Sequence, residues 1–562
     1  MNLTPQERAD GRERFCAEVS RRGFLKTGLA AGLVAGGGLG AFYFGYEKAH
    51  GRPVRVGVIG TGDEGNVLIG AISPDYLQVT AIADVRPYNI HRAFHGDHYS
   101  DAALAARCGL MTKYGWKTED EARRHVKVYG DWRELIQNEK NNLDGVIIAL
   151  PLHLHAPAAI AAMRARLHVL TEKLMGHSVH ECKEMARVAA NTNRLLATGH
   201  QRHYNILYQE AMDTIRRGTL GELHYIRAQW HRSNLPGSDS WQPPMPPELK
   251  PKDKQAAKLL NDLRSWETAL ANARGREIDV WRKKVAQLRA QLADRTVQAD
   301  KHGYQPVEVK DGAGTIVYRG PAAEELIRWR LWDRTGGGLM VELGSHQLDA
   351  AGIFISALHG GEKKHPLCVM ATANQPIFPP DRDAEDHVAC LFEFPAPDYD
   401  PKSEIGRRRK IGVQYASING NGFGGYGEIV YGTKGTLILD REQEAMLFMG
   451  PSASKVTVEK NAGAALDTQA SGAAQTAVAG ATRQVSRGYT EELEHWAWCI
   501  QNPAPENVPR CMPKVALGDA VIALVTNMSA REGRRIDFEQ AWFDPDDDAT
   551  PEGVKPDVKR YV

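Results

Sequence analysis

The chain has 562 residues, of which 42% are hydrophobic and 25% charged, a composition typical of a globular protein with two or three domains. Its formal net charge of +1 lacks the basic excess of a nucleic-acid-binding protein, and we expect no nucleic-acid partner. Seven cysteines show no C-x-x-C pair and no regular spacing, which argues against a disulfide framework and a cysteine-based zinc site.

The first 50 residues predict an export signal instead of part of the folded domains. The stretch SRRGFLK at 20–26 contains the pair Arg21 and Arg22, and a glycine-rich, weakly apolar run follows from about 27 to 46. This pattern is typical of the twin-arginine signal, which exports folded proteins. A chance arginine pair before a buried helix is the alternative. No A-x-A cleavage site stands out, so the segment could stay as a membrane tether of a periplasmic or otherwise exported protein.

The first strand predicted after this segment leads into a glycine-rich turn. VRVGVIGTGDEGNVLIGAI begins at Val54 and places Gly60, Gly62 and Gly65 in the pattern G-x-G-x-x-G, between a β-branched run and an apolar helix. Gly60 permits a tight turn, Gly62 lets the backbone approach a pyrophosphate, and Gly65 lets the helix pack close to the strand. The helix N-terminus adds N–H donors for the phosphates. We therefore expect a dinucleotide to bind here.

The second predicted strand, LQVTAIAD, ends at Asp84, where a carboxylate can bind the hydroxyls of the adenosine ribose. Asp84 therefore favours NAD over NADP. Arg86 follows closely and could bind a 2′-phosphate, so NADP stays as the alternative coenzyme.

Strands continue to alternate with helices over residues 51–200. LDGVIIALP at 143–151 is nearly all apolar, as expected of a strand buried on both faces of a parallel sheet, and HVLTEKLM at 168–175 is another strand and turn. We predict an α/β fold that begins with a doubly wound Rossmann domain. Ligands bind at the carboxyl edge of such a sheet, so polar residues after successive strands are expected to line a site, although each alone could be a surface loop. These residues are Pro151, His153, His155, Glu172, Lys173, Gln201 and Arg202.

Several later segments have a composition of their own. Residues 245–300 begin with the proline-rich PPMPPELKPKDK and continue as a strongly helix-forming sequence, which predicts a helical hairpin over the site or at an oligomer contact. In WRLWDRTGGG at 329–338, Trp332 could stack on a sugar ring or pack in the core. Residues 451–486 are rich in Ala, Ser, Thr, Gly and Gln and predict a mobile loop, and residues 546–562 form a tail.

The stretch GGGLMVELGSHQLD at 336–349 spaces Glu342, His346 and Asp349 so that a helix would place all three on one face. Such a face could bind zinc, bind a substrate or merely be solvated. Zinc needs further ligands on a matching face, and the chain contains no H-E-x-x-H motif, so we expect no metal.

The chain resembles the Gfo/Idh/MocA oxidoreductases, which include glucose-fructose oxidoreductase and inositol dehydrogenase. The resemblance covers most of the chain after about residue 54 and rests on GTGDEG, TEKLM, GHQRHYN, GGGLMVELGSHQLD and YGTKGTL. It implies a Rossmann domain followed, over residues 201–545, by an α/β domain with a large, mostly antiparallel sheet. Because that sheet often carries the oligomer interface in the family, the resemblance also implies a homo-oligomer, either a dimer or a tetramer.

The resemblance also implies roles for individual residues. Lys173 would lie near the nicotinamide and the substrate hydroxyl, with Leu174 in place of the family's usual proline. Hydride removal from a carbinol needs a base for the hydroxyl proton, and His346 is the first choice, with Lys173 as partner or alternative base. Glu342, in place of the usual aspartate, would bind substrate hydroxyls or orient His346. Expected cofactor contacts are Gly60, Thr61, Gly62, Glu64, Gly65, Asp84, Arg86, Pro151, His155 and Glu172. Expected substrate contacts are His153, Gln201, Arg202, Asp349 and Trp332.

Three functions compete on this sequence. The first is an exported NAD(P)-dependent oxidoreductase that acts on a sugar, polyol or glycoside hydroxyl and holds its cofactor tightly. The second is an NAD-dependent glycoside hydrolase that uses transient ring oxidation and elimination, and so needs no carboxylate pair. The third is a non-catalytic sugar-binding protein that keeps the fold. Free NAD is scarce outside the cytoplasm, so a retained coenzyme that is regenerated in each cycle fits export best.

Overall fold

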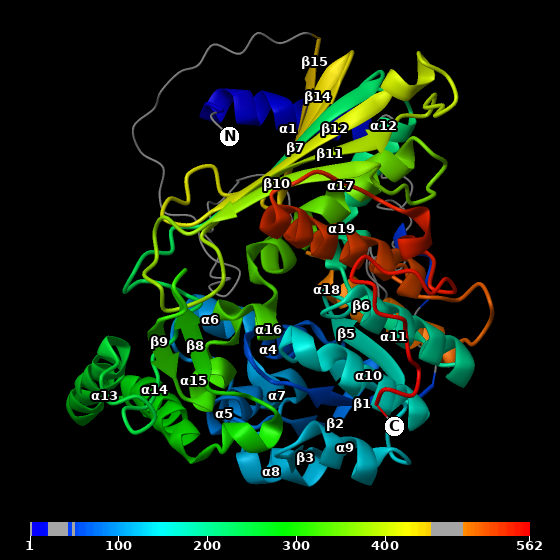
Figure 1. Cartoon of the computed structure of the whole chain (residues 1–562). Coiled ribbons are helices and arrows are strands. Elements are labelled where there is room, and N and C mark those ends of the chain that lie inside the picture. Colours follow the sequence, from blue (N-terminus) through cyan, green and yellow to red (C-terminus); the bar gives the residue numbers. More distant parts are fainter. Residues whose placement is uncertain (1–2, 21–42, 48–50, 451–486, 562) are drawn as a thin grey trace.

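The computed structural model describes residues 3–20, 43–47, 51–450 and 487–561. They form two α/β domains stacked end to end, each with its own sheet (Figure 1). The expected fold class is confirmed: a parallel Rossmann sheet is followed by a mostly antiparallel one. The arginine pair at 21–22 and the predicted mobile loop at 451–486 lie outside the described residues.

The first domain holds a six-stranded sheet with the order β3-β2-β1-β4-β5-β6, and its neighbouring strands are parallel. The strands are β1 (Val54–Ile59), β2 (Leu77–Ala83), β3 (Lys127–Tyr129), β4 (Gly145–Ile148), β5 (His168–Glu172) and β6 (Leu196–Gly199). The helices are α4 (Asp63–Ala71), α5 (Pro87–His95), α6 (Asp101–Ala106), α7 (Gly109–Tyr114), α8 (Glu119–His125), α9 (Trp132–Glu139), α10 (His155–Arg164) and α11 (Val179–Thr192).

Helices cover both faces of this sheet, which explains why its strands are almost wholly apolar. Successive side chains of a strand point to opposite faces. In β4, Val146 and Ile148 pack with α9, α10 and α11, whereas Ile147 packs with α4, α5 and α7. With both faces covered by helices, the carboxyl edge is where ligands bind in such a sheet.

The second domain is built on an eight-stranded sheet with the order β15-β14-β13-β7-β12-β11-β10-β16. Among the described strands, the β7–β12 pair is parallel and the other neighbours are antiparallel. The strands are β7 (Leu223–His231), β10 (Cys368–Asn374), β11 (His387–Pro395), β12 (Lys410–Ile418), β13 (Tyr426–Gly432), β14 (Gly435–Asp440), β15 (Glu444–Met449) and β16 (Ile536–Asp537). Helices α12 (Ile206–Arg216), α17 (Ser345–Ala357) and α19 (Pro513–Glu532) pack against one face of it (Figure 1).

Helix α1 (Pro5–Ser20) lies against the edge strand β15, although the sequence placed its residues in an export signal. Phe15 and Val19 are buried, and Arg8 pairs with Asp440 at 2.7 Å. An edge strand exposes unpaired backbone groups, and α1 covers this one. No helix in the described part of the chain is both long and apolar enough to span a membrane.

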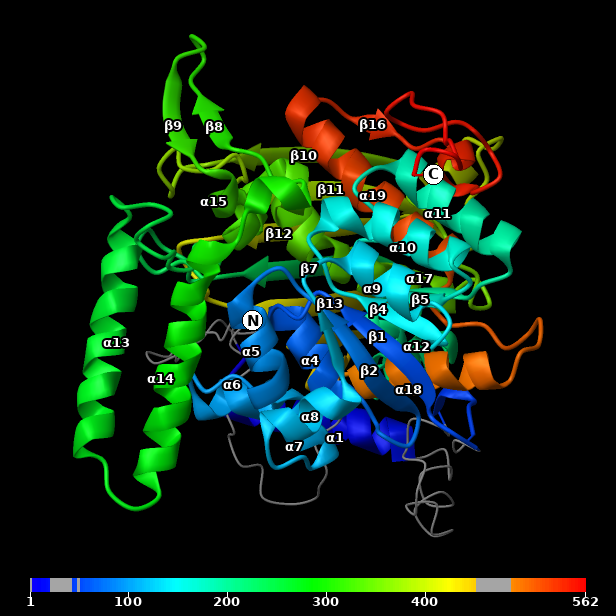
Figure 2. The ribbon, with the colours of Figure 1, turned by 90° about the horizontal axis from the view of Figure 1, so that it is seen from below.

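Residues 254–320, here called the inserted segment, extend the second domain along the flank of the first. They contain the helical hairpin α13 (Lys254–Asn272) and α14 (Glu277–Ala293), then the β-hairpin of β8 (Val307–Lys310) and β9 (Ile316–Gly320). Figure 2 shows the two helices standing beside the first domain, and α14 packs against α5. Helix α15 (Ala322–Ile327) then leads back to the junction of the two domains.

The end of the chain returns to the first domain. Helix α18 (Tyr489–Gln501) buries Leu493, Trp496 and Ala497 in the core beside α4. Residues 546–561 run along α11, where Glu552 bonds to His180 at 2.9 Å. The first domain is therefore assembled from segments that are far apart in the sequence.

Candidate active site

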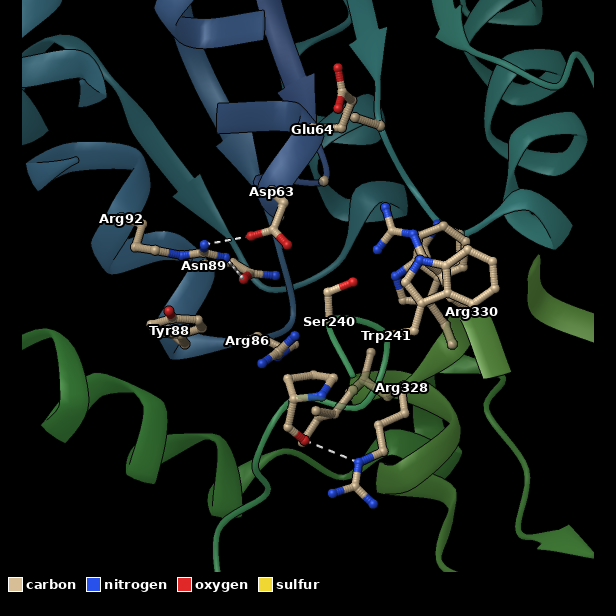
Figure 3. A pocket seen from close by; sticks show the side chains of 18 of the residues that line it. Asp63, Glu64, Arg86, Tyr88, Asn89, Arg92, Ser240, Trp241, Arg328 and Arg330 are labelled. Atoms are coloured by element: carbon tan, nitrogen blue, oxygen red, sulfur yellow. Dashed lines mark hydrogen bonds and ion pairs between the residues drawn. The ribbon is translucent and has the colours of Figure 1, made fainter. Parts of the chain in front are cut away.

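A cavity of about 730 Å³ lies at the carboxyl edge of the Rossmann sheet and is lined by residues of both domains. Ligands of doubly wound sheets bind at this edge. Figure 3 shows Asp63, Glu64 and Arg92 of the first domain on one side and Trp241 and Arg330 of the second on the other.

In the glycine turn between β1 and α4, Gly62 leaves room for a ligand, whereas Gly60 and Gly65 pack tightly against the backbone. A Cβ on Gly60, which has φ +85°, would lie 2.3 Å from the carbonyl oxygen of Ala149. A Cβ on Gly65 would lie 2.1 Å from the carbonyl oxygen of Gly60. A Cβ on Gly62 would meet only Asn89 Nδ2, at 3.7 Å, and Gly62 borders the cavity. This open cradle at a helix N-terminus fits the pyrophosphate of a dinucleotide.

Asp84 is held by backbone donors at the adenosine end of this cavity. Its carboxylate accepts hydrogen bonds from the backbone N–H of Thr61 at 2.8 Å and of Arg86 at 2.9 Å, and from Asn89 Nδ2 at 3.1 Å. Arg86 Nε in turn pairs with Asp294 at 2.8 Å. The carboxylate is thus oriented where the ribose hydroxyls of a dinucleotide are expected, and Thr61 holds it from behind.

The acids of the first turn of α4 carry less negative charge than their number suggests. Asp63 pairs with Arg92 Nη1 at 2.6 Å. Burial raises the pKa of Glu64, although Arg487 and Lys173 oppose the shift. Burial and the Glu64 charge raise the pKa of Glu172 well above its usual range. Burial thus favours the protonated forms of Glu64 and Glu172, and Arg92 offsets the charge of Asp63, so each lessens the repulsion that a pyrophosphate would meet here.

Lys173 and Glu342 meet at the opposite end of the cavity. Lys173 Nζ donates to the backbone carbonyl of Glu342 at 2.8 Å and lies 3.8 Å from its carboxylate. Arg330 Nε donates to the same carboxylate at 2.9 Å. Burial alone would raise the pKa of Glu342, but Lys173 and Arg330 lower it below its usual value. Glu342 is therefore an ionised hydrogen-bond acceptor at the cavity wall.

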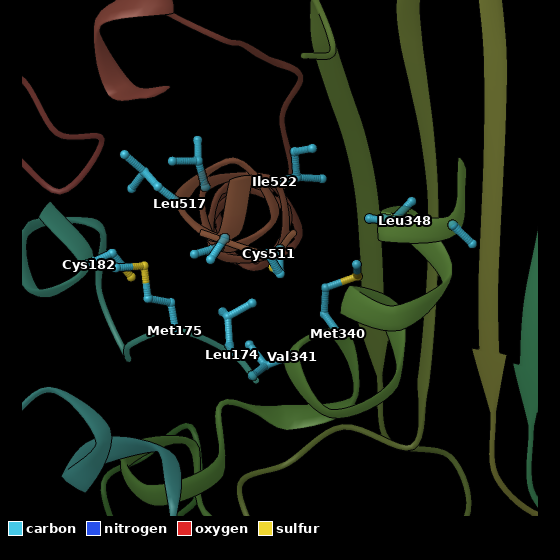
Figure 4. Packing of buried hydrophobic residues seen from close by; sticks show 14 of the residues in the cluster. Leu174, Met175, Cys182, Met340, Val341, Leu348, Cys511, Leu517 and Ile522 are labelled. Carbon is cyan, nitrogen blue, oxygen red and sulfur yellow. The ribbon is translucent and has the colours of Figure 1, made fainter. Parts of the chain in front are cut away.

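The apolar neighbours of these two residues fix their positions. Leu174 follows Lys173 through a cis peptide bond, and Val341 precedes Glu342. Figure 4 shows both side chains packed in one buried cluster with Met340 and with Leu517 of α19. Residues Met340–Gly344 form a π-helical turn before α17, a feature often found at functional sites.

His346, in the first turn of α17, lines the cavity beside Trp230, with their ring centroids 5.6 Å apart. Burial lowers the pKa of His346 well below its usual value, and the charges of Lys173 and Arg202 add to the shift. His346 is therefore a neutral imidazole at neutral pH. It can accept a hydrogen bond or a proton from a hydroxyl group without first losing one.

Most of the predicted cofactor contacts meet at this cavity. Those that line it are Gly60, Gly62, Glu64, Asp84, Arg86, Pro151 and Glu172, together with Lys173, Gln201, Glu342 and His346. Thr61 and Gly65 lie directly behind the glycine turn. His155 lies behind Lys173, with its ring nitrogens 2.8 Å from the carbonyl oxygens of Leu150 and Leu174.

Four described residues expected to contact substrate are placed elsewhere. Arg202 is buried in an ion pair with Glu442, at 2.7 Å. Trp332 is buried in the core and stacks on Tyr318. Asp349 faces away from the cavity, where it bonds to His203 at 2.9 Å. Only Gln201 of that group lines the cavity.

His153, the fourth, packs against Tyr304 of the second domain instead of the cavity, with ring centroids 5.5 Å apart. Burial lowers the pKa of His153 to about 3. Tyr304 itself lines the cavity, whereas His153 does not.

Several cavity residues escaped the sequence analysis. Trp230 lies near the end of β7, Arg232 and Trp241 belong to the loop after it, and Tyr489 begins α18. In the segment WRLWDR the sequence suggested a tryptophan as the sugar contact. The structure shows that Arg330 of this segment contacts Glu342. The folding of distant segments onto the cavity brings these residues in, and no local pattern marks them.

A second polar cluster lies behind the cavity. Lys363 Nζ pairs with Asp519 at 2.5 Å and lies 3.6 Å from Asp349. His200, Cys511 and Asp519 offer possible metal-ligand atoms within 4.8 Å of one another, but the lysine ammonium already supplies a cation to Asp519. We read the cluster as an ion-pair network that supports α17.

The comparisons with known proteins agree with this geometry. The sequence model of the Gfo/Idh/MocA oxidoreductase family, with its NAD-binding Rossmann fold, matches residues 54–200. A glycosyl hydrolase family 109 protein from Stenotrophomonas maltophilia (strain K279a) is 31% identical over 185 residues, which are 32% of this chain and 36% of that protein. The first curated relatives are matched over 36% to 46% of their length, so less than half of each is covered.

Solved structures extend the likeness to the second domain. An inositol dehydrogenase homolog from Azotobacter vinelandii complexed with NAD+ has a TM-score of 0.53 at 14% identity, and covers 87% of this chain and 98% of its own. The same homolog complexed with NADH and myo-inositol has a TM-score of 0.52 at 14% identity, and covers 88% and 99%. At this identity the likeness shows the fold alone. Residues 54–200 are an NAD-binding Rossmann domain that matches the sequence model of the Gfo/Idh/MocA oxidoreductase family.

Proposed function

We propose that the protein is an NAD(P)-dependent oxidoreductase that oxidises a hydroxyl group of a sugar, polyol or glycoside by taking a hydride from the carbon that bears it, and that it keeps its coenzyme tightly bound. One observation carries the proposal. A single cavity joins the open glycine cradle and Asp84 at one end to Lys173, Glu342 and His346 at the other. The cradle suits a dinucleotide and the far end suits proton transfer. Hydride transfer to the coenzyme and proton removal from the hydroxyl can therefore take place in the same cavity.

The bound nicotinamide would supply the hydride acceptor, and the chemistry of the chain concerns the proton. His346 lines the cavity with a neutral imidazole, so a ring nitrogen is free to take the hydroxyl proton, although its lowered pKa makes it a weaker base than an exposed histidine. Lys173, held by the carbonyl of Glu342, places an ammonium where it stabilises the developing alkoxide. Glu342 is ionised and can accept a hydrogen bond from a neighbouring hydroxyl, which would orient the substrate.

The wall opposite the glycine turn suits a carbohydrate. Trp230, Trp241 and Trp329 line the cavity with Asn234 and Gln242. Aromatic faces bind the apolar faces of sugars, and amides bind the hydroxyls around them. Together they support a polyhydroxylated substrate and leave its identity open.

Glycoside hydrolysis through transient ring oxidation is the second candidate. The name of the Stenotrophomonas relative supports it, since that protein is a glycosyl hydrolase family 109 protein. The same residues would serve, because the group that accepts the hydroxyl proton during oxidation donates it back when the carbonyl is reduced again. A non-catalytic sugar-binding role is the third candidate, and the convergence of Lys173, Glu342 and His346 speaks against it.

We further propose that the protein is exported by the twin-arginine route and acts in the periplasm, either free or tethered, as a homo-oligomer. The motif SRRGFLK supports export. A folded protein can be exported with its coenzyme in place, which matches a cavity lined by residues of both domains.

The first test is the nucleotide that the purified protein carries. The protein is denatured, and the released small molecules are identified by mass. We expect nearly one NAD or NADP per chain. A protein that carries no nucleotide and binds none on addition would refute the oxidoreductase and the hydrolase together.

The second test separates the two reactions. Polyols, free sugars and aryl glycosides are offered while NADH absorbance and aglycone release are followed. Net NADH supports dehydrogenation, and aglycone release without net NADH supports hydrolysis. His346→Ala and Lys173→Ala should each lower the rate by about 10²–10⁴ with the nucleotide still bound, as expected for loss of a general acid or base. His224→Ala, at an exposed position of β7, is the matched control. Full activity in both site variants would disprove the assignment of these roles.

A further inference from the structure

The inserted segment is fastened to the coenzyme half of the cavity by buried polar contacts. Gln287 of α14 accepts a hydrogen bond from the backbone N–H of His98 at 2.6 Å and donates to Asp97 at 2.8 Å. Asp97 also binds Arg92, the partner of Asp63 in the first turn of α4. The helix that carries the glycine cradle is thus linked through two side chains to the inserted segment.

The end of α14 reaches the residue that decides between coenzymes. Asp294, only 1% exposed, accepts from Arg86 Nε at 2.8 Å and from the backbone N–H of Tyr88 at 3.0 Å. Arg86 lines the cavity next to Asp84. A buried carboxylate that lost Arg86 would be costly, so this pair holds both partners in place.

Apolar side chains also join the two domains at the adenosine end of the cavity. Tyr304 and Leu326 pack with Leu154 of the first domain in a cluster separate from the main cores. His302 pairs with Asp131 at 3.0 Å, on the loop between β3 and α9. Leu288, Gln291, His302 and Tyr304 all line the cavity, so the inserted segment forms part of its wall at the adenosine end.

The charges at this end disfavour a 2′-phosphate. In a Rossmann domain, an arginine near the ribose accommodates that phosphate in NADP. Here the charge of Arg86 is already matched by Asp294, and Asp84 stands beside it. A phosphate would bring nearly two further negative charges next to two carboxylates, whereas ribose hydroxyls only donate hydrogen bonds to Asp84.

We propose that Asp294 is a specificity-determining residue: by pairing with Arg86 it makes the inserted segment a clamp that retains NAD and rejects NADP. The proposal rests on the proposed function, because it needs a nicotinamide coenzyme in the cavity. The proposal gives the helices α13 and α14 a function. The sequence alone allowed either a cover for the site or an oligomer contact.

The test compares Asp294→Asn with Asp279→Asn on the same helix. Asp279 is 59% exposed, pairs with Arg282 and Lys283 of α14 and does not line the cavity, so its variant makes the same chemical change away from the coenzyme. Release of bound NADH is followed by stopped-flow fluorescence after mixing with excess NAD, and affinities of coenzyme-free protein for NAD and NADP are measured by calorimetry. In Asp294→Asn we expect at least tenfold faster release and at least a tenfold rise in the affinity for NADP relative to NAD. Wild type and Asp279→Asn should agree with each other.

A second variant protects the test against misfolding of the first. Arg86→Gln breaks the same ion pair but removes the phosphate-binding group, so release should accelerate without any gain in NADP affinity. Release rates and coenzyme preference unchanged in both variants would overturn the proposal, and so would equal effects in Asp279→Asn. If wild type binds neither nucleotide, the proposed function itself fails. If wild type binds NAD and the variants behave like it, only the clamp fails.

Discussion

His200 is buried between two carboxylates with its ring nitrogens 3.7 Å from Asp349 and 4.0 Å from Asp519. Burial lowers the pKa of His200 to about 3, although Asp349 opposes the shift. In an unfolded chain a histidine titrates near pH ~6.5. Between these two values the unfolded chain binds the additional proton, so folding stability falls as the pH drops below about 6.5.

This predicts a histidine-dependent loss of stability in mild acid. His200→Asn should flatten the decline in the free energy of unfolding between pH 7 and pH 5, since each such histidine raises the unfolding constant by up to about tenfold per pH unit. Urea titrations at several pH values measure it. His125→Asn, at an exposed position, serves as the control and should keep the wild-type slope. An unchanged slope in His200→Asn would contradict the buried neutral histidine.

Whether a residue lies at the cavity could be predicted from the sequence where a local motif fixes its position. It could not be predicted where contacts between distant segments fix it. Lys173, Glu342 and His346 converge as expected, because each lies in a recognisable turn or helix start. Arg202 also follows a strand, but its partner Glu442 is 240 positions away in the sequence and no pattern links them. Asp349 shares the helical spacing of His346, yet the approach of His203 and Lys363 draws it into another cluster.

At the scale of elements, the turn from β1 to α4 gives a paired prediction. Gly65→Ala would force a methyl group against the carbonyl of Gly60 and should destabilise the protein by about 1–3 kcal/mol, as overpacking does. Gly62→Ala meets no such obstacle and has φ −67°, so stability should hardly change. Its methyl group would instead occupy the cradle and weaken coenzyme binding at least tenfold. Thermal unfolding and calorimetric titration separate the two effects, and a strongly destabilised Gly62→Ala would count against the cradle.

Some helices and strands could be predicted from the sequence and others could not. The Rossmann strands were predictable because burial on both faces makes them continuous apolar runs. The helix-forming stretch within 245–300 corresponds to α13 and α14. The sequence did not predict helix α1 as part of the fold, because its residues were assigned to the export signal. Their contact with β15 forms only once the second domain has folded.

At the scale of the whole molecule, the last residues hold the first domain through a buried ammonium group. Lys183 of α11 is fully buried, and its Nζ donates to the carbonyl oxygens of Ala541, Asp547 and Ala549 at 2.7–2.8 Å. Deleting residues 546–562 removes two of these acceptors. We expect the deletion to cost at least about 1–3 kcal/mol, as for a buried donor left unsatisfied.

A double-mutant cycle tests this arrangement. Lys183→Met should recover part of the stability in the shortened chain, because no ammonium is then left without its acceptors, while in the full-length chain it should destabilise. Lys140→Met, at an exposed position of the first domain that both chains contain, is the control. Strictly additive effects of the deletion and Lys183→Met, measured by urea unfolding, would show that the tail does not act through this lysine.

The return of α18 has a consequence for experiments that exchange domains between such proteins. Trp496 packs against the strand β4, so closely that a Cβ on Gly145 would lie 2.9 Å from its ring. A gene fragment that encodes only residues 51–200 would therefore lack a piece of its own core and should not yield a stable domain. Exchange of the coenzyme half between two such proteins must bring in residues 489–501 as well as the tail residues that bind Lys183. The coenzyme half is thus encoded by three separate stretches of gene, and an exchange at the apparent domain boundary would divide it.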